Sequence, residues 1–263
     1  MLGSETLLSI SNASVSGETL MVFRGGHGPK VLLLHDEWGI QPDEQIWRLL
    51  GERAEIIAPV APGFETTPTS PSIKNVRDLA LLYNAALEDL VDEPVMVIGV
   101  SFGAWIATEM AVMNTHRISR LALLGPVGLR FGPPEQRNYA DLFALDDQQL
   151  ANTLYLNPEN ARIATSETSR ESAVAWARNR EATAFYGWEP YLYTPDMQRW
   201  TEHLRLPVTI LHGSNDRFVM DGYYEKFAAS FSDSSLIEIP NSGHFPHIEA
   251  PRTTFESLDR LLS

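Results

Sequence analysis

The feature that most constrains this chain is an apolar strand pattern that runs through a glycine-flanked serine directly into a helical pattern. Residues 94–100 (PVMVIGV) have the length and composition of a buried strand, and residues 102–114 carry apolar side chains at helical spacing. Between them stands Gly99-Val100-Ser101-Phe102-Gly103. Glycine on both sides leaves room for a very tight turn and for close packing of helix on strand. The pattern predicts an α/β fold.

The rest of the chain repeats this alternation, which predicts a mostly parallel sheet with helices on both faces. Strands are expected at residues 6–11, 19–24, 30–35, 54–59, 94–100, 119–124, 207–212 and 235–239, and helices near residues 42–51, 73–91, 102–114 and 252–262. Residues 126–203 have helical patterns and many aromatic side chains but no strand pattern. We expect a core of residues 1–125 and 204–263, with residues 126–203 as a helical lid insertion.

Composition narrows the possible partners. The 263 residues include 34 acidic and 20 basic side chains, a formal net charge of −14, without any basic run. Nucleic acid and anionic membranes are therefore not expected partners, because phosphates are bound mainly through Lys and Arg. The absence of cysteine excludes disulfides, thiolate zinc sites and cysteine nucleophiles.

The sequence contains no signal-peptide pattern and no apolar run of ~18 residues, so we expect a cytoplasmic protein. No metal, phosphate-loop or nucleotide motif is present, so we expect a small-molecule substrate and no cofactor.

Ser101 lies where a hydroxyl would point out of the sheet and act as a nucleophile. The next backbone N–H, that of Phe102, would lie beside a developing oxyanion and would begin a helix, whose N-terminus favours negative charge.

An acid and a histidine follow later strands. Asp216 comes just after the strand at residues 207–212, and His244 follows Gly243 after the strand at residues 235–239. Neutral imidazole can accept the serine proton, and a buried aspartate would orient the imidazole. We predict Ser101 as nucleophile, His244 as general base and Asp216 as its partner. Asp221 and His247 are the alternatives.

These motifs, together with GGHGPKVLLLH, the Ala61–Phe64 loop, LHGSNDRFV and NSGHFPHIEAP, resemble the α/β-hydrolase superfamily over nearly the whole chain. The chain is similar to lidded esterases, carbon–carbon bond hydrolases and cofactor-free haloperoxidase-like enzymes. Serine at position 101 disfavours haloalkane dehalogenases and epoxide hydrolases, which use aspartate there.

One loop departs from that family. His35-Asp36-Glu37-Trp38-Gly39 has aspartate where glycine usually follows the histidine. The resemblance implies that the Glu37 N–H is the second oxyanion donor, although Trp38 could supply it instead. Because a carboxylate would oppose developing negative charge, we expect the Asp36 and Glu37 side chains to point outward, with Trp38 as a pocket wall.

A lid over the catalytic edge of the sheet would enclose an apolar pocket, which favours a modest-sized, partly apolar ester or ketone rather than a polymer. Tyr186 and Trp188 are candidate substrate contacts, because they break a helical stripe that we expect to pack inward: Ala173, Trp176, Ala177, Arg180 and Ala184. Related carbon–carbon bond hydrolases tend to carry tryptophan after the histidine, where this chain has Phe245, so ester cleavage is favoured. A carbon–carbon bond hydrolase and a ligand-binding protein without turnover remain alternatives.

Overall fold

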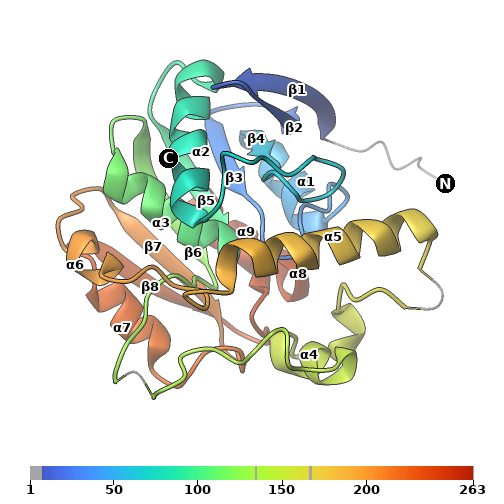
Figure 1. Ribbon diagram of the computed structural model, residues 1–263. Helices are drawn as coiled ribbons and strands as arrows, with labels where there is room; N and C mark the ends of the chain where they lie inside the picture. Colours follow the sequence, from blue (N-terminus) through green and yellow to red (C-terminus); the bar gives the residue numbers. More distant parts are fainter. Residues whose placement is uncertain (1–7, 134, 166–167, 263) are drawn as a thin grey trace.

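A computed structural model describes residues 8–133, 135–165 and 168–262. Its central sheet has eight strands in the order β1-β2-β4-β3-β5-β6-β7-β8 (Figure 1). All neighbours from β4 to β8 are parallel, whereas β2 is antiparallel to both β1 and β4. The strands are β1 Ser9–Val15, β2 Glu18–Gly26, β3 Lys30–Leu34, β4 Glu55–Pro59, β5 Val95–Val100, β6 Ile118–Leu124, β7 Val208–Gly213 and β8 Ser234–Ile239.

Helices cover both faces of this sheet. One face carries α2 Val76–Leu90 and α3 Phe102–Met113, which pack against each other, and the opposite face carries α1 Gln45–Gly51 and α9 Pro251–Asp259. Two more short helices follow the last two strands: α7 Tyr223–Ala229 and α8 Pro246–Glu249. Because both faces are covered, every residue of central β5 is buried, as expected for a parallel strand. The predicted mostly parallel α/β sheet is confirmed.

The first strand differs from its predicted bounds. Residues 6 and 7 lie outside the described residues, and β1 continues beyond residue 11 to Val15. Ser16 and Gly17 both have positive φ, 50° and 85°, which makes a two-residue hairpin turn that matches the twist of the strands. This tight turn lets β1 pair with β2 along its whole length.

Residues 126–203 (the 126–203 segment) connect β6 to β7 and contain α4 Asp147–Leu154, the short 3-10 helix Pro158–Asn160, α5 Arg170–Gly187 and α6 Met197–Thr201. Its longest helix, α5, contacts the loops after β3 and β4, so the segment lies over the carboxyl ends of the parallel strands (Figure 1). The prediction that the Ala173, Trp176, Ala177, Arg180 and Ala184 stripe of α5 packs inward is wrong. The buried residues are instead Asn179, Ala182, Thr183, Tyr186 and Gly187. Within the described residues, no helix is long and apolar enough to span a membrane.

Candidate active site

Ser101 occupies the turn between β5 and α3, in a backbone conformation that few residues adopt. Its φ is 45° and its ψ is −105°. Close packing at this turn requires the flanking glycines. A Cβ on Gly103 would lie 2.2 Å from the Leu34 carbonyl oxygen, and one on Gly99 would lie 2.6 Å from the Ala104 Cα. The strained turn thus holds the Ser101 side chain at the carboxyl edge of the sheet.

The structure brings Ser101, His244 and Asp216 into one hydrogen-bonded chain. Ser101 Oγ lies 2.8 Å from His244 Nε2, and His244 Nδ1 lies 2.8 Å from Asp216 Oδ2. Asp216 comes from the loop after β7 and His244 from the loop after β8. Parallel strands end at the same edge, so residues far apart in sequence meet there. The side chains of Ser101 and His244 are fully buried.

Three donors hold Asp216. Besides His244, the Phe218 N–H donates to Oδ1 at 2.8 Å, and the Tyr224 hydroxyl donates to Oδ2 at 2.5 Å. Burial raises the pKa of Asp216, but the His244 charge and these hydrogen bonds outweigh burial, so the pKa lies below its ordinary value. Asp216 is therefore ionised at neutral pH.

Asp216 in turn raises the affinity of His244 for a proton. Burial lowers the pKa of His244, but the charge and hydrogen bond of Asp216, with the nearby Glu37 carboxyl, raise it above 6.5 overall. The ring also packs against Phe218 and Phe245, with centroids 4.6 and 4.9 Å away. These contacts fix the ring plane so that Nε2 faces Ser101.

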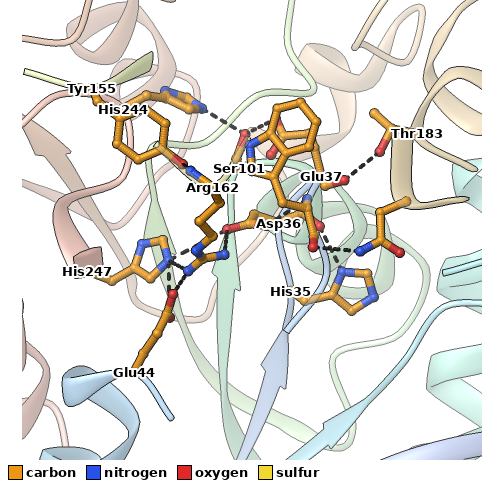
Figure 2. Close-up of polar contacts among 12 residues, drawn as sticks. His35, Asp36, Glu37, Glu44, Ser101, Tyr155, Arg162, Thr183, His244 and His247 are labelled. Carbon is orange, nitrogen blue, oxygen red and sulfur yellow. Dashed lines mark hydrogen bonds and ion pairs between the residues drawn. The ribbon is translucent and has the colours of Figure 1, made fainter. Parts of the chain in front are cut away.

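Glu37 does not point outward as expected. Its side chain turns inward and is buried, with Oε1 2.5 Å from Ser101 Oγ, and Figure 2 shows Ser101 between His244 and Glu37. Thr183 of α5 donates to the Glu37 carbonyl at 3.0 Å and so holds the backbone of this loop. The expectation that only the backbone of residue 37 faces the site is wrong, because the 126–203 segment covers the loop and leaves its side chains no path to solvent.

The Glu37 carboxyl is in an environment that favours its neutral form. Burial raises its pKa to about 7, against the lowering effect of His244 and of hydrogen bonds from Ser101 and its own backbone N–H. The second oxygen, Oε2, is buried and has no hydrogen-bond partner among the described residues. Glu37 thus brings a titratable group and an unpaired oxygen to the nucleophile.

Asp36 also points inward, but into an ion-pair cluster. Oδ1 accepts the Trp38 N–H at 2.8 Å, and Oδ2 lies 3.1 Å from Arg162 Nη1 and 3.6 Å from His247 Nε2. Arg162 comes from the 126–203 segment and also pairs with Glu44 (Figure 2). Burial raises the pKa of Asp36, but the Arg162 charge and His247 outweigh it, so Asp36 is ionised. The cluster compensates this buried charge.

His247, the rival to His244, belongs to that cluster and has no contact with Ser101 in the described structure. Burial lowers its pKa to about 4, so it is neutral at neutral pH. Asp221, the alternative acid, lies further along the loop, after Met220. The carboxyl that contacts His244 is that of Asp216.

The three predicted substrate contacts lie in different settings. Trp38 is buried and stacks on Trp176 of α5, with ring centroids 6.4 Å apart. Tyr186 is also buried, donates to the Pro62 carbonyl at 2.9 Å and packs on Phe102. Trp188 is 56% exposed and lines a surface cavity. Only Trp38 and Tyr186 therefore adjoin residues of the site.

Three residues that contact the candidate site were not predicted from the sequence. His35 accepts the Ala61 N–H at 3.1 Å through Nε2 and so ties the loops after β3 and β4 together, and Tyr224 contacts Asp216. Arg162 carried no sequence signal, since it lies in irregular chain 126 residues from its partner Asp36. The described residues contain no cluster of three or more His, Cys, Asp or Glu side chains that could hold a metal ion.

Comparison with known proteins supports this architecture. The chain is 25% identical over 244 residues to a pimeloyl-[acyl-carrier protein] methyl ester esterase of Aromatoleum aromaticum, covering 85% of this chain and 94% of the esterase. It is equally 25% identical over 269 residues to the 2-hydroxy-6-oxo-6-(2'-aminophenyl)hexa-2,4-dienoic acid hydrolase of Metapseudomonas resinovorans, covering 90% of this chain and 85% of that hydrolase.

A solved structure gives the same picture of the fold. The naproxen esterase of Bacillus subtilis superposes with a TM-score of 0.75 at 15% identity, covering 97% of this chain and 92% of the esterase. Residues 26–257 match the sequence model of the alpha/beta hydrolase family. With the sheet order, the serine turn and this match in agreement, the chain belongs to the alpha/beta hydrolase family.

Proposed function

We propose that this protein is a serine hydrolase that cleaves a small to medium, partly apolar carboxylic ester through an acyl-enzyme. One observation carries the proposal: the buried hydrogen-bonded chain from Ser101 through His244 to Asp216, with its two distances of 2.8 Å. A hydroxyl, an imidazole and an ionised carboxylate in that order are the parts that nucleophilic acyl transfer requires.

In the first half-reaction, Ser101 Oγ attacks the ester carbonyl carbon and His244 Nε2 accepts the hydroxyl proton. The tetrahedral intermediate then expels the alcohol, which takes its proton from His244. Asp216 stays ionised throughout, holds the Nδ1–H tautomer and stabilises the imidazolium. In the second half-reaction, water attacks the acyl-enzyme with His244 again as base, and the acid is released.

The oxyanion of both intermediates would lie at the first turn of α3. The Phe102 N–H is the proposed donor there, because Phe102 begins this helix directly after Ser101. The N-terminus of α3 adds partial positive charge at the same place. The Glu37 carboxyl also lies beside the nucleophile, with Oε1 2.5 Å from Ser101 Oγ.

The 126–203 segment is proposed to act as the lid. A groove of about 490 Å³ lies between α5 and the core and is lined by Trp38, Trp176, Asn179 and Arg162 among others. Trp38 directly follows Glu37 in the chain, and its indole stacks on that of Trp176 in the wall of this groove, which suits a flat, partly apolar group. We propose Trp38 and Tyr186 as the walls nearest the acyl group, with Trp188 a contact only for a longer substrate.

A carbon–carbon bond hydrolase is the second candidate. It is favoured by the similarity to the Metapseudomonas resinovorans hydrolase. That hydrolase and the methyl ester esterase have the same sequence identity to this chain, 25%. Both reactions would use the same three residues, so the geometry of the triad does not separate them.

Labelling and turnover test both candidates. A fluorophosphonate probe should label the protein at Ser101, and Ser101→Ala should abolish labelling and lower ester turnover by on the order of 10⁴-fold or more while the protein stays folded. A panel of aryl esters with increasing acyl length is then assayed beside a 2-hydroxy-6-oxo-2,4-dienoic acid. The preferred substrate distinguishes ester cleavage from carbon–carbon bond cleavage. Substantial ester hydrolysis by a well-folded Ser101→Ala protein would contradict the proposal.

A further inference from the structure

The Ser101 hydroxyl faces two buried acceptors but has one proton. Glu37 Oε1 lies 2.5 Å from Oγ, and His244 Nε2 lies 2.8 Å away. Nucleophilic attack needs the serine proton to move to His244. An ionised Glu37 would compete for that proton, whereas a neutral Glu37 has a proton of its own. The contact is therefore compatible with catalysis only in the neutral form of Glu37.

The carboxyl of Glu37 belongs to the residue that the resemblance to the family assigns as the second oxyanion donor. Its Oε1 lies 2.5 Å from Ser101 Oγ, so the carboxyl stands beside the nucleophile. Its second oxygen, Oε2, is buried and has no partner among the described residues. A proton on Oε2 is therefore free to bond to the oxygen of a substrate carbonyl at this place.

The charged and titratable groups that interact with Glu37 come from its own loop, the loop after β8, the 126–203 segment and α7. Among them, Asp36 on its own loop raises its pKa and His244 lowers it, and burial is the largest influence. Glu37 in turn affects the pKa of groups from the 126–203 segment and from α7: Tyr155, Arg162, Tyr191 and Tyr224. Arg162, the permanent cation of this set, is paired with Asp36 and Glu44. Among the described residues, His244 is the one cation that lowers the pKa of Glu37, and it does so only when its imidazole is protonated.

We propose that Glu37 is a further catalytic residue: its carboxyl keeps a proton and donates a hydrogen bond to the ester carbonyl oxygen as negative charge develops there. This inference rests on the proposed function. A bond forms between Ser101 Oγ and the carbonyl carbon, the carbonyl π electrons move to oxygen, and the serine proton passes to His244. The Glu37 proton is shared with the oxyanion but not transferred. When the intermediate collapses, the carbon–alkoxy bond breaks and His244 protonates the departing alcohol.

An acid in this place has a physical advantage over a carboxylate. An ionised Glu37 would repel the oxyanion at short range in a low-dielectric site, whereas a neutral carboxylic acid stabilises it. Carboxylic acids held neutral by an apolar site can fill this role. The active form of the pair therefore has its single proton on Glu37, with His244 neutral.

Three variants separate the possible roles of Glu37. Glu37→Gln keeps an N–H donor of the same size, and Glu37→Ala removes the donor. Glu109→Gln is the matched control, because Glu109 is a buried acid of α3, hydrogen-bonded by Thr194, whose pKa burial also raises, and it does not contact the triad. Initial rates with one aryl ester, fluorophosphonate labelling and thermal unfolding are measured for each.

We expect Glu37→Gln to stay within about tenfold of the wild-type kcat, and Glu37→Ala to lose about 10²- to 10³-fold in kcat with little change in KM, as for loss of an oxyanion donor. Glu109→Gln should stay within about twofold. The pH profile gives a readout that a structural role would not move. Wild-type kcat should fall as pH rises above neutral and Glu37 ionises, and this alkaline fall should be absent in Glu37→Gln, while the acid limb due to His244 remains in both.

Two results would overturn the inference. A Glu37→Ala protein that is as fast as wild type or faster would mean that the carboxyl merely fills the site. A Glu37→Gln protein that is as slow as Glu37→Ala, although both are folded, would mean that the ionised form is required. Failure of the proposed function looks different, since Ser101 would then not be labelled and Ser101→Ala would keep its activity.

Discussion

Tyr224 shows how a residue outside the three predicted positions can tune the site. Its hydroxyl donates to Asp216 Oδ2, the same oxygen that accepts the His244 Nδ1–H. This second donor disperses the carboxylate charge and so weakens its hold on the imidazolium. Its neighbour Tyr223 has a similar hydroxyl, 2.8 Å from that of Tyr139, and does not contact Asp216 in the described structure.

Replacing Tyr224 by Phe should therefore raise the pKa of His244 and shift the acid limb of the kcat/KM profile to higher pH. The rate should fall by about 10- to 100-fold, the range expected for one hydrogen bond to a charged group. Tyr223→Phe serves as the control and should leave the acid limb in place. Equal shifts in both variants would mean that general loosening of α7, rather than the contact with Asp216, is responsible. The pH profiles of the two variants, measured side by side, decide this.

The residues that sequence could predict are those whose position follows from topology. Ser101, Asp216 and His244 each follow a strand, and parallel strands end at one edge, so their meeting needs no further information. The inward turn of Glu37 could not be predicted in this way. It depends on Arg162 neutralising Asp36 next to it and on Thr183 holding the loop backbone, and both come from the 126–203 segment.

At the scale of elements, the 126–203 segment joins the core through polar contacts that no periodicity reveals. The buried face of α5 includes Asn179 and Thr183, which donate to the carbonyls of Trp38 and Glu37 at 2.7 and 3.0 Å. The predicted stripe counted apolar residues only and so selected another face. The inner strands β3, β4, β5 and β7 were predictable from apolar runs, because burial on both sides demands them, whereas the edge strands β1 and β8 are mostly exposed.

Arg162 joins the 126–203 segment to the core through ion pairs with Asp36 and Glu44. Arg162→Met leaves Asp36, which is 2% exposed, as an unpaired buried charge and should destabilise the protein by about 3–5 kcal/mol. Arg117→Met removes a surface pair with Glu88 and should cost no more than about 1 kcal/mol. Denaturant unfolding of both variants tests the comparison. Asp36→Asn in the Arg162→Met protein should restore part of the loss, and failure to do so would show that charge is not the cause.

At the scale of the molecule, Glu37 links folding to pH. Its pKa is about 7 in the folded protein, raised by burial, against about 4.5 when unfolded. Between these values the unfolded chain releases a proton that the folded protein keeps, so the contribution of Glu37 to stability is lost as pH rises through this window. Glu37→Gln removes the effect. The unfolding free energy of this variant minus that of wild type should therefore grow between pH 4.5 and 8, by on the order of 3 kcal/mol.

Glu88→Gln is the control for this measurement. The Arg117 hydrogen bonds hold the pKa of Glu88 below its ordinary value, so its linkage to folding lies at lower pH. The stability difference between Glu88→Gln and wild type should be flat from pH 5 to 8. A flat curve for Glu37→Gln as well would show that Glu37 ionises as readily in the folded protein as in the unfolded chain.

The complete burial of Ser101 and His244 has a kinetic consequence. If the 126–203 segment is the lid that we propose, a ligand reaches them from a minor conformation in which this segment has moved, and the apparent affinity of every ligand is weakened according to the fraction of molecules in that conformation. The observed rate constant for inactivation by different phosphonates should then rise with phosphonate concentration and level off at one common first-order value. That plateau would measure the frequency of opening, a property of the polypeptide that is independent of the inhibitor.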